Sequence, residues 1–424
     1  MKELGGARMV AQGNTGTPPQ LHEIPPREVA GRDTVARFEA QFRGAAVACL
    51  RILDQKGPDR VYCDFQDDFV TREQVDGLPV YHFVQVKTKA ARKYQWTRSD
   101  LFGLAKNVPG ASKNAASSGP KYTYKTPSSE QLTKVKDSFV GKLLEHTARF
   151  STACGSVTFL TNSHLSDDVE SIANAILEGD FEERTVGYLF QHYALINSFL
   201  DPPGEDEVRA AIKKLSFTAD VDYVDPGHND FEIKAGKVLL EFSEIDLNHN
   251  ESSELATKLL ALVQSKSSRK LVAELTAQEL DDMAGIGLED LLALLPISKA
   301  AYYNFINSGD EKALKNASIL QRRLSQAGAS SEIIETASRW KIEWDNWFRT
   351  HRHAYEYDLL FLKAEVAAIY DKWAKGDVSF AGLRHEVLAL RSTISVRHIA
   401  AMVSDEILVG GVLACLVRGE TNGV

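Results

Sequence analysis

The chain has 424 residues, which is long enough for two or three domains. Its apolar content of 44% and charged content of 25% are ordinary for a globular protein. The net charge of −9 gives no global sign of nucleic-acid binding. Local charge differs, because residues 87–149 hold 13 Lys and Arg against four Asp and Glu. This stretch suits either a surface that binds one polyanion or a solvated loop.

The four cysteines are scattered, without the paired spacing that is typical of zinc sites or of a disulfide framework. No apolar run is long enough to span a bilayer, and residues 1–26 lack the apolar segment of a signal peptide. We therefore expect a cytoplasmic protein with no membrane partner.

The first part of the chain predicts a small mixed sheet flanked by helices. Residues 1–28 are rich in Gly and Pro and predict a flexible leader, and apolar residues at helical spacing predict a helix over 33–53. Two strands follow over 60–70 and 80–89, and the pair Asp76-Gly77 between them indicates a hairpin. A helix over 129–148 and a strand over 156–160 complete this unit.

Helical patterns dominate from about residue 166 onward. A strand-like interlude over 215–245, with the apolar run 238–242, is the exception, and a helix is predicted over 276–295. We therefore expect an α/β (α+β) N-terminal domain over 29–265, with its core over 30–165. A mostly α-helical domain over 266–424 would bind another chain or itself.

The strand over 80–89 places a glutamine and a lysine, Gln85 and Lys87, on one face, because side chains alternate along a strand. Polar groups in an apolar strand need partners. If this strand pairs with the one over 60–70, Asp68 can converge with Gln85 and Lys87. Two oxygen ligands and an ammonium are the parts of a Mg²⁺-dependent phosphodiesterase, with Mn²⁺ as an alternative metal. The alternative is a solvated strand edge, where Lys is common.

In the nuclease interpretation, Asp68 and Gln85 bind the metal. Lys87 then orients the attacking water and neutralises the charge that develops on the phosphorane. Additional side chains that could reach this site are Asp64, Glu39 and Gln41. The basic segment that follows has aromatic residues among its lysines and fits a groove that tracks a DNA backbone without reading bases. The predicted DNA contacts are Lys89, Arg92, Lys93, Trp96 and Arg98.

Six segments carry a resemblance to a known family: GRDTVARFEAQ from residue 31, CDFQDD from 63, FVQVKT from 83, Trp96-Thr97, KDSFVGKLLEH from 136 and VTFLTN from 157. They resemble the nuclease domain of CD-NTase-associated endonucleases, effectors of bacterial anti-phage systems within the PD-(D/E)XK superfamily. The resemblance implies a restriction-endonuclease-like fold over about residues 30–165. It also implies that Asp68 is the motif aspartate, that Gln85 replaces the second acidic residue, and that Lys87 is the motif lysine. Asp64 and Asp67 stand where some relatives carry a glutamate.

The helical tail lacks the alternating strands and helices of the sensor domains that read cyclic oligonucleotides. It resembles the nuclease subunit of Lamassu-type systems instead, which implies an SMC-like ATPase complex or a homo-oligomer as partner. We therefore expect a Mg²⁺-dependent endonuclease that cuts double-stranded DNA with low sequence specificity when a partner or oligomerisation releases it. The alternatives are a cyclic-oligonucleotide-activated nuclease, a restriction-type nuclease, or a nucleic-acid-binding scaffold subunit that does not cut.

Overall fold

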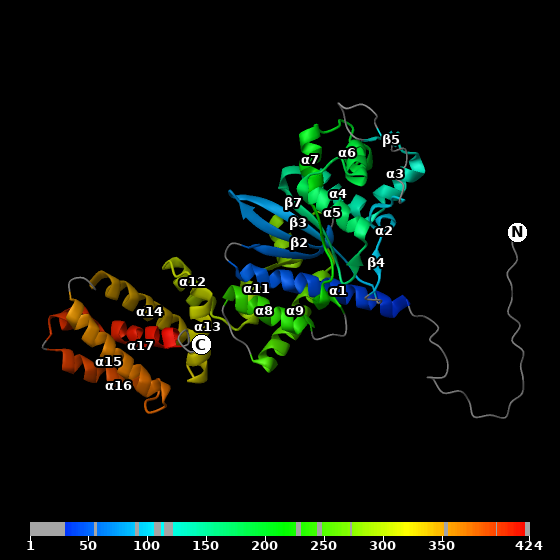
Figure 1. The fold of residues 1–424 in the computed structure, drawn as a ribbon. Coiled ribbons are helices and arrows are strands. Elements are labelled where there is room, and N and C mark those ends of the chain that lie inside the picture. Colours follow the sequence, from blue (N-terminus) through cyan, green and yellow to red (C-terminus); the bar gives the residue numbers. More distant parts are fainter. Residues whose placement is uncertain are drawn as a thin grey trace, which may run out of the picture.

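The computed structural model describes residues 30–419, apart from 55–56, 90–92, 106–111, 114–121, 226–229, 244–247, 272–273, 352–354 and 396 (Figure 1). The leader predicted over 1–28 lies outside these residues. A six-stranded mixed sheet organises the N-terminal part, in the order β10-β1-β2-β3-β7-β9. Its strands are β1 (Arg60–Phe65), β2 (Asp67–Val75), β3 (Leu78–Lys87), β7 (Cys154–Thr161), β9 (Leu215–Thr218) and β10 (Gly285–Gly287).

The order of strand directions fixes where the functional residues meet. β1 and β2 are antiparallel, as are β2 and β3, while β3, β7 and β9 run parallel. At the β2–β3 turn Asp76 and Gly77 have φ of 52° and 78°, so the predicted hairpin is confirmed. Two short ladders lie beside the sheet, β4 (Gln95–Trp96) with β8 (His164–Leu165) and β5 (Ser112–Lys113) with β6 (Tyr122–Thr123).

The single strand predicted over 60–70 is wrong, because the chain folds back within it. Phe65 at the end of β1 pairs with Asp67 at the start of β2, so the turn is made at Gln66. Gln66 and Asp64 adopt left-handed φ of 65° and 51°, in a stretch without Gly or Pro to indicate a turn. The alternation of faces expected across 63–68 therefore does not hold.

Helices cover both faces of the sheet (Figure 1). On one face α1 (Ala30–Leu50), α8 (Asp230–Ser243) and α9 (His249–Ser267) share a core with Phe69 and Val86. Phe83 lies in the second core, on the other face, as alternation along β3 requires. The elements on this side are α2 (Arg98–Phe102), α3 (Ser129–Lys136), α4 (Phe139–Phe150), α5 (Asp167–Glu178), α6 (Arg184–Ile196) and α7 (Glu205–Lys213).

Two further predictions are corrected in this part. The helix expected over 129–148 is interrupted at Ser138, whose Oγ accepts the Gly141 N–H over 3.0 Å and so caps a new helix, α4. The apolar run 238–242, expected to be a strand, lies within α8. A short apolar run fits either element, and here Val238 and Leu239 are buried in the core that α1 shares.

The C-terminal part is almost wholly helical, as predicted, and the α+β fold class is confirmed. The last helix, α17, packs against four others, α13 to α16. A side chain at Gly410 of α17 would collide with the main chain of Trp340 in α14, so glycine permits this close approach. The helices are α10 (Ala277–Met283), α11 (Leu288–Leu294), α12 (Lys299–Asn307), α13 (Ala313–Gln326), α14 (Ser331–His351), α15 (Glu356–Ala374), α16 (Leu383–Ile394) and α17 (Asp405–Gly419).

One edge of the sheet is formed by a segment that the sequence predicts to lie in the helical domain. The helix predicted over 276–295 is interrupted by β10, in which Ile286 pairs with Val61 of β1. Just before it, Asp281 of α10 accepts the Tyr62 hydroxyl over 2.6 Å and pairs with Arg60 over 3.1 Å. The sheet and the first C-terminal helices are therefore joined by both backbone and side-chain contacts.

Candidate active site

The antiparallel pairing of β2 and β3 brings the start of β2 beside the end of β3. There Lys87 Nζ donates to Asp68 Oδ2 over 3.0 Å, and the Val86 N–H donates to the same oxygen over 2.6 Å. The other carboxylate oxygen, Oδ1, accepts from Gln41 Nε2 of α1 over 2.5 Å. Two of the three motif residues, together with Gln41 from the first helix, thus lie where the sequence placed them.

The charge at this site is only partly compensated. The side chain of Asp68 is 13% exposed and that of Lys87 is 28% exposed. Burial raises the pKa of Asp68 above its ordinary range, and the Lys87 ammonium and the Val86 N–H offset this effect only in part. The neighbouring Asp67 carboxylate adds to the rise of that pKa. Burial therefore disfavours the charged form of Asp68 despite the lysine beside it.

The third motif residue, Gln85, takes a partner that the sequence did not indicate. Its side chain is 8% exposed, and its Nε2 approaches Asp67 Oδ1 at 3.5 Å, a long hydrogen bond. Its amide oxygen, Oε1, is buried and has no hydrogen-bond partner among the described residues. The predicted convergence of Asp68, Gln85 and Lys87 is thus indirect, because Gln85 contacts Asp67, the neighbour of Asp68 in the chain. The amide oxygen of Gln85, a strong hydrogen-bond acceptor, is left without a partner among the described residues.

The sequence does not identify His146 of α4 as a residue of this cluster. It also predicts no contact for Asp67. Asp67 Oδ1 accepts the Asp68 N–H over 2.9 Å, and its Oδ2 lies 3.0 Å from His146 Nε2. The imidazole stacks on Phe83 of β3, with ring centroids 4.3 Å apart. His146 lies among buried leucines at helical spacing, which in the sequence is typical of a core residue, so only the pairing of α4 with the strands identifies it.

The other predicted site residues lie apart from the Asp68–Lys87 pair. Glu39 forms an ion pair with Arg43 on its own helix over 2.7 Å. Asp64 is exposed beside the β1–β2 turn. Within the described part of the chain, no hydrogen bond or ion pair joins Glu39 or Asp64 to Asp68.

The donor set suits a hard cation with few protein ligands. Among the described residues, no group of three or more His, Cys, Asp or Glu side chains is arranged to hold a metal ion. The unpartnered Gln85 Oε1 and the Asp68 carboxylate are nevertheless oxygen ligands of the kind that Mg²⁺ takes, and Mg²⁺ keeps several waters when it binds proteins. The residues present therefore fit the metal that the sequence predicted.

The family model described as Cap4, dsDNA endonuclease domain, matches residues 29–267. The chain belongs to this family. The match covers more than half of the chain and includes every residue of the cluster around Asp68. Residues 29–267 thus form a double-stranded DNA endonuclease domain of the kind found in anti-phage defence. A search of curated proteins found no match to the chain.

The predicted DNA contacts of this Cap4 domain have different surroundings. Lys93 is exposed, and Lys89 Nζ lies 4.4 Å from the centroid of the Tyr94 ring. Trp96 is only 3% exposed, so the structure places its ring in the core rather than on a DNA-binding surface. Arg98 pairs with Asp168 over 2.9 Å. Arg92, the fifth residue predicted to contact DNA, lies outside the described residues.

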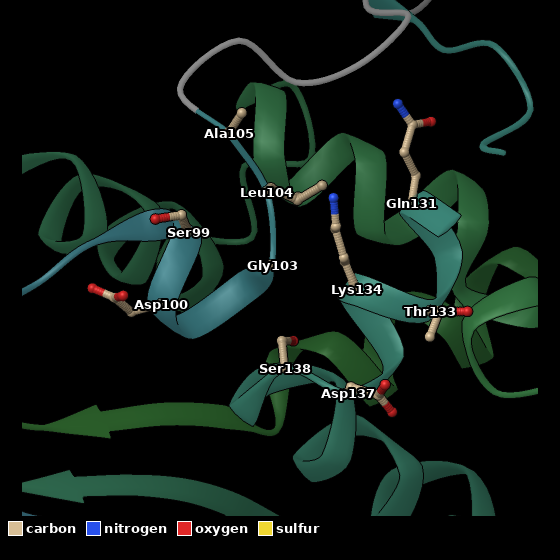
Figure 2. A pocket seen from close by; sticks show the side chains of 10 residues that line it. All are labelled: Ser99, Asp100, Gly103, Leu104, Ala105, Gln131, Thr133, Lys134, Asp137 and Ser138. Carbon is tan, nitrogen blue, oxygen red and sulfur yellow. The ribbon is translucent and has the colours of Figure 1, made fainter. Parts of the chain in front are cut away.

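A cavity of about 610 Å³ lies between α2 and α3 of the Cap4 domain (Figure 2). Lys134 extends into it between Leu104 and Gln131. Ser138 lines its base, and the ring centroid of the next residue, Phe139, is 6.0 Å from Lys87 Nζ.

Within the described ranges, none of the helices combines the length and the apolar character needed to cross a membrane.

Proposed function

We propose that this chain is a Mg²⁺-dependent endonuclease that cuts double-stranded DNA with low sequence specificity as the effector of an anti-phage defence system. The observation that carries the proposal is the Asp68–Lys87 contact of 3.0 Å, together with a Gln85 Oε1 that has no partner among the described residues, inside the segment that matches the Cap4 family. A buried acid, a free amide oxygen and an ammonium at adjoining strand ends are what phosphodiester hydrolysis needs.

Each residue has a distinct part in this proposal. Asp68 and Gln85 would hold the metal through their side-chain oxygens, and a bound Mg²⁺ would supply an activated water and neutralise phosphate charge. The side chain of Lys87 is more exposed than that of Asp68, so its ammonium can approach the phosphate while Asp68 orients it. Gln41 fixes the other oxygen of Asp68 and so sets the rotation of that carboxylate.

The partner of this nuclease is proposed to be an SMC-like ATPase complex, with self-assembly as a further route to activation. The helical part supports a docking role, because α15 exposes large apolar side chains, among them Tyr357 and Leu360. A nuclease of low specificity needs such restraint to spare the DNA of its own cell. Activation by a cyclic oligonucleotide and restriction-type specificity are the alternatives within the nuclease class.

The test is cleavage of supercoiled plasmid in Mg²⁺ and in Mn²⁺, with and without the candidate partner, by the wild type and by Lys87→Ala. We expect Lys87→Ala to lower the cleavage rate by at least about 100-fold, because it removes a charge that stabilises the transition state. Its affinity for DNA, measured by fluorescence anisotropy, should change by less than about tenfold.

Lys258→Ala is the matched control, because Lys258 is an exposed α9 residue in an ion pair with Glu254 of its own helix. It should cut like the wild type. Should the activated wild type bind DNA and leave the plasmid whole in both metals, the chain is a binding or scaffold subunit instead.

A further inference from the structure

The buried pair Asp67–His146 has no part in the chemistry described above. We propose that Asp67, held by His146, is a positioning residue that determines which end of the Gln85 amide faces the metal position. This inference rests on the proposed function and assigns a task to two side chains beneath the candidate site.

An amide at a metal position poses a problem that a carboxylate does not. A carboxylate presents two equivalent oxygens, so either rotation leaves an oxygen toward the cation. A glutamine presents an oxygen at one end and an NH₂ group of nearly the same shape at the other, and only the oxygen binds a cation. A site built on Gln85 therefore needs a neighbour that selects one rotation.

Asp67 is the neighbour that can make this selection. Carboxylate oxygens accept hydrogen bonds, so Asp67 engages the NH₂ end of Gln85, and the distance from Gln85 Nε2 to Asp67 Oδ1 is 3.5 Å. The same Oδ1 accepts the Asp68 N–H over 2.9 Å. One oxygen of Asp67 thus contacts both proposed ligand residues. With the NH₂ end engaged, Oε1 is left at the other end, buried and without a hydrogen-bond partner in the described chain.

His146 fixes Asp67 in turn. Its Nε2 lies 3.0 Å from Asp67 Oδ2, and the side chains of Asp67 and His146 are only 6% and 9% exposed. The imidazole lies parallel to the Phe83 ring, with an angle of 6° between the two planes. Phe83 is two residues before Gln85 on the same strand. His146 of α4 therefore contacts both Asp67 and the strand that carries Gln85. Such supporting contacts are how proteins orient metal ligands.

The experiment is a double-mutant cycle between positions 67 and 85. Asp67→Asn introduces an amide that can donate to Gln85 Oε1 and turn the glutamine around. We expect it to lower the affinity for Mn²⁺, measured by titration calorimetry, by about 10–100-fold, and the cleavage rate by a similar factor. In a Gln85→Glu background the same substitution should lower the Mn²⁺ affinity and the cleavage rate by less than about threefold, because both ends of a carboxylate are oxygens that can bind the cation.

Two further variants complete the cycle. His146→Phe removes the hydrogen bond to Asp67 and keeps a flat ring against Phe83. It should therefore also lower Mn²⁺ affinity and cleavage less in the Gln85→Glu background than in the wild-type background. Asp206→Asn, an identical change at an exposed position of α7, should alter neither Mn²⁺ affinity nor cleavage in either background. Thermal unfolding of every variant shows whether the fold is kept.

The outcomes separate the two proposals. Equal losses from Asp67→Asn in both backgrounds would make Asp67 a purely structural residue and overturn the inference. A wild type that binds Mn²⁺ and does not cut DNA would overturn the proposed function, while the Mn²⁺ affinities of the cycle would still decide the role of Asp67. A wild type that binds no Mn²⁺ would overturn the inference as well, because no metal position would exist.

Discussion

Two buried charge clusters in this chain, one at the ends of β2 and β3 and one among the C-terminal helices, differ in how completely their groups are paired. In the helical part, Lys341 donates to Asp310 over 3.0 Å and forms an ion pair with Asp345 over 3.0 Å, and its ammonium lies 4.9 Å from the centroid of the Phe305 ring. Asp310 also accepts from Asn316 over 2.8 Å. These contacts join α12, α13 and α14, and every group named has its partner.

The cluster in the sheet is built from similar parts and is left incomplete. Asp68 also has a lysine at 3.0 Å, yet burial raises its pKa, whereas the Lys341 ammonium helps to lower the pKa of Asp310. Gln85 Oε1 and His146 Nδ1 are buried without partners among the described residues. Buried polar groups are normally satisfied, so these two unsatisfied atoms, which lie beside a buried acid in a domain of the Cap4 nuclease family, suit a place for a ligand. The two clusters thus differ in how completely they are paired, and the incompletely paired one is the proposed active site.

The largest expected effect comes from replacing the central aspartate of each cluster by asparagine. Asp68→Asn should lower DNA cleavage by at least about 100-fold. It should change the free energy of unfolding by less than about 1 kcal/mol, because it removes a charge that burial disfavours. Asp310→Asn should leave cleavage unchanged and cost about 1–3 kcal/mol of stability, because Lys341 loses an ionic partner in the interior. Urea unfolding and plasmid cleavage measure both. A larger stability loss in Asp68→Asn than in Asp310→Asn would contradict the distinction.

A smaller effect should appear at acidic pH, where we can predict the direction in which the Asp310–Lys341 cluster changes the stability of the protein. Desolvation raises the pKa of Asp310, but Lys341 and the hydrogen bonds outweigh it, so this pKa lies below its unfolded value. The unfolded state then binds more protons, and stability is present above about pH 4 and falls as pH drops through the folded pKa. Asp310→Asn should therefore show a shallower loss of unfolding free energy between about pH 4 and pH 2 than the wild type, by roughly 1 kcal/mol. An unchanged slope would mean that Lys341 does not stabilise the ionised Asp310.

The sequence predicts the parts of this site that depend on local pattern. Alternation along β3 separates Phe83 from Val86 and sets Gln85 and Lys87 near the strand end, and the Asp76-Gly77 turn fixes the hairpin register. Apolar spacing also places α1, and hence Gln41, against the same strand end. These features follow from interactions between residues close in sequence.

The parts that failed depend on contacts between distant segments. The turn at Gln66 uses a left-handed residue other than glycine, which surrounding strands must hold in place. The apolar run in α8 and the short edge strand β10 take their conformations from their neighbours in space, α1 and β1. His146 is 79 residues from Asp67 in the sequence, so its role becomes visible only after α4 has docked on the sheet.

The smallest expected effect extends the comparison from the two buried clusters to the surfaces near them. Lys93, which follows Lys87 in the same stretch of sequence, is exposed, whereas Lys372 of the helical part is paired with Glu386 over 2.7 Å. Lys93→Ala should lower DNA affinity by less than about tenfold and reduce the slope of log affinity against log salt by about 0.9, the loss of one phosphate contact. Lys372→Ala should change neither, because its charge is already compensated. Equal changes in both variants would mean that DNA also runs across the helical part, and the separation of a cutting region from a docking region would then fail.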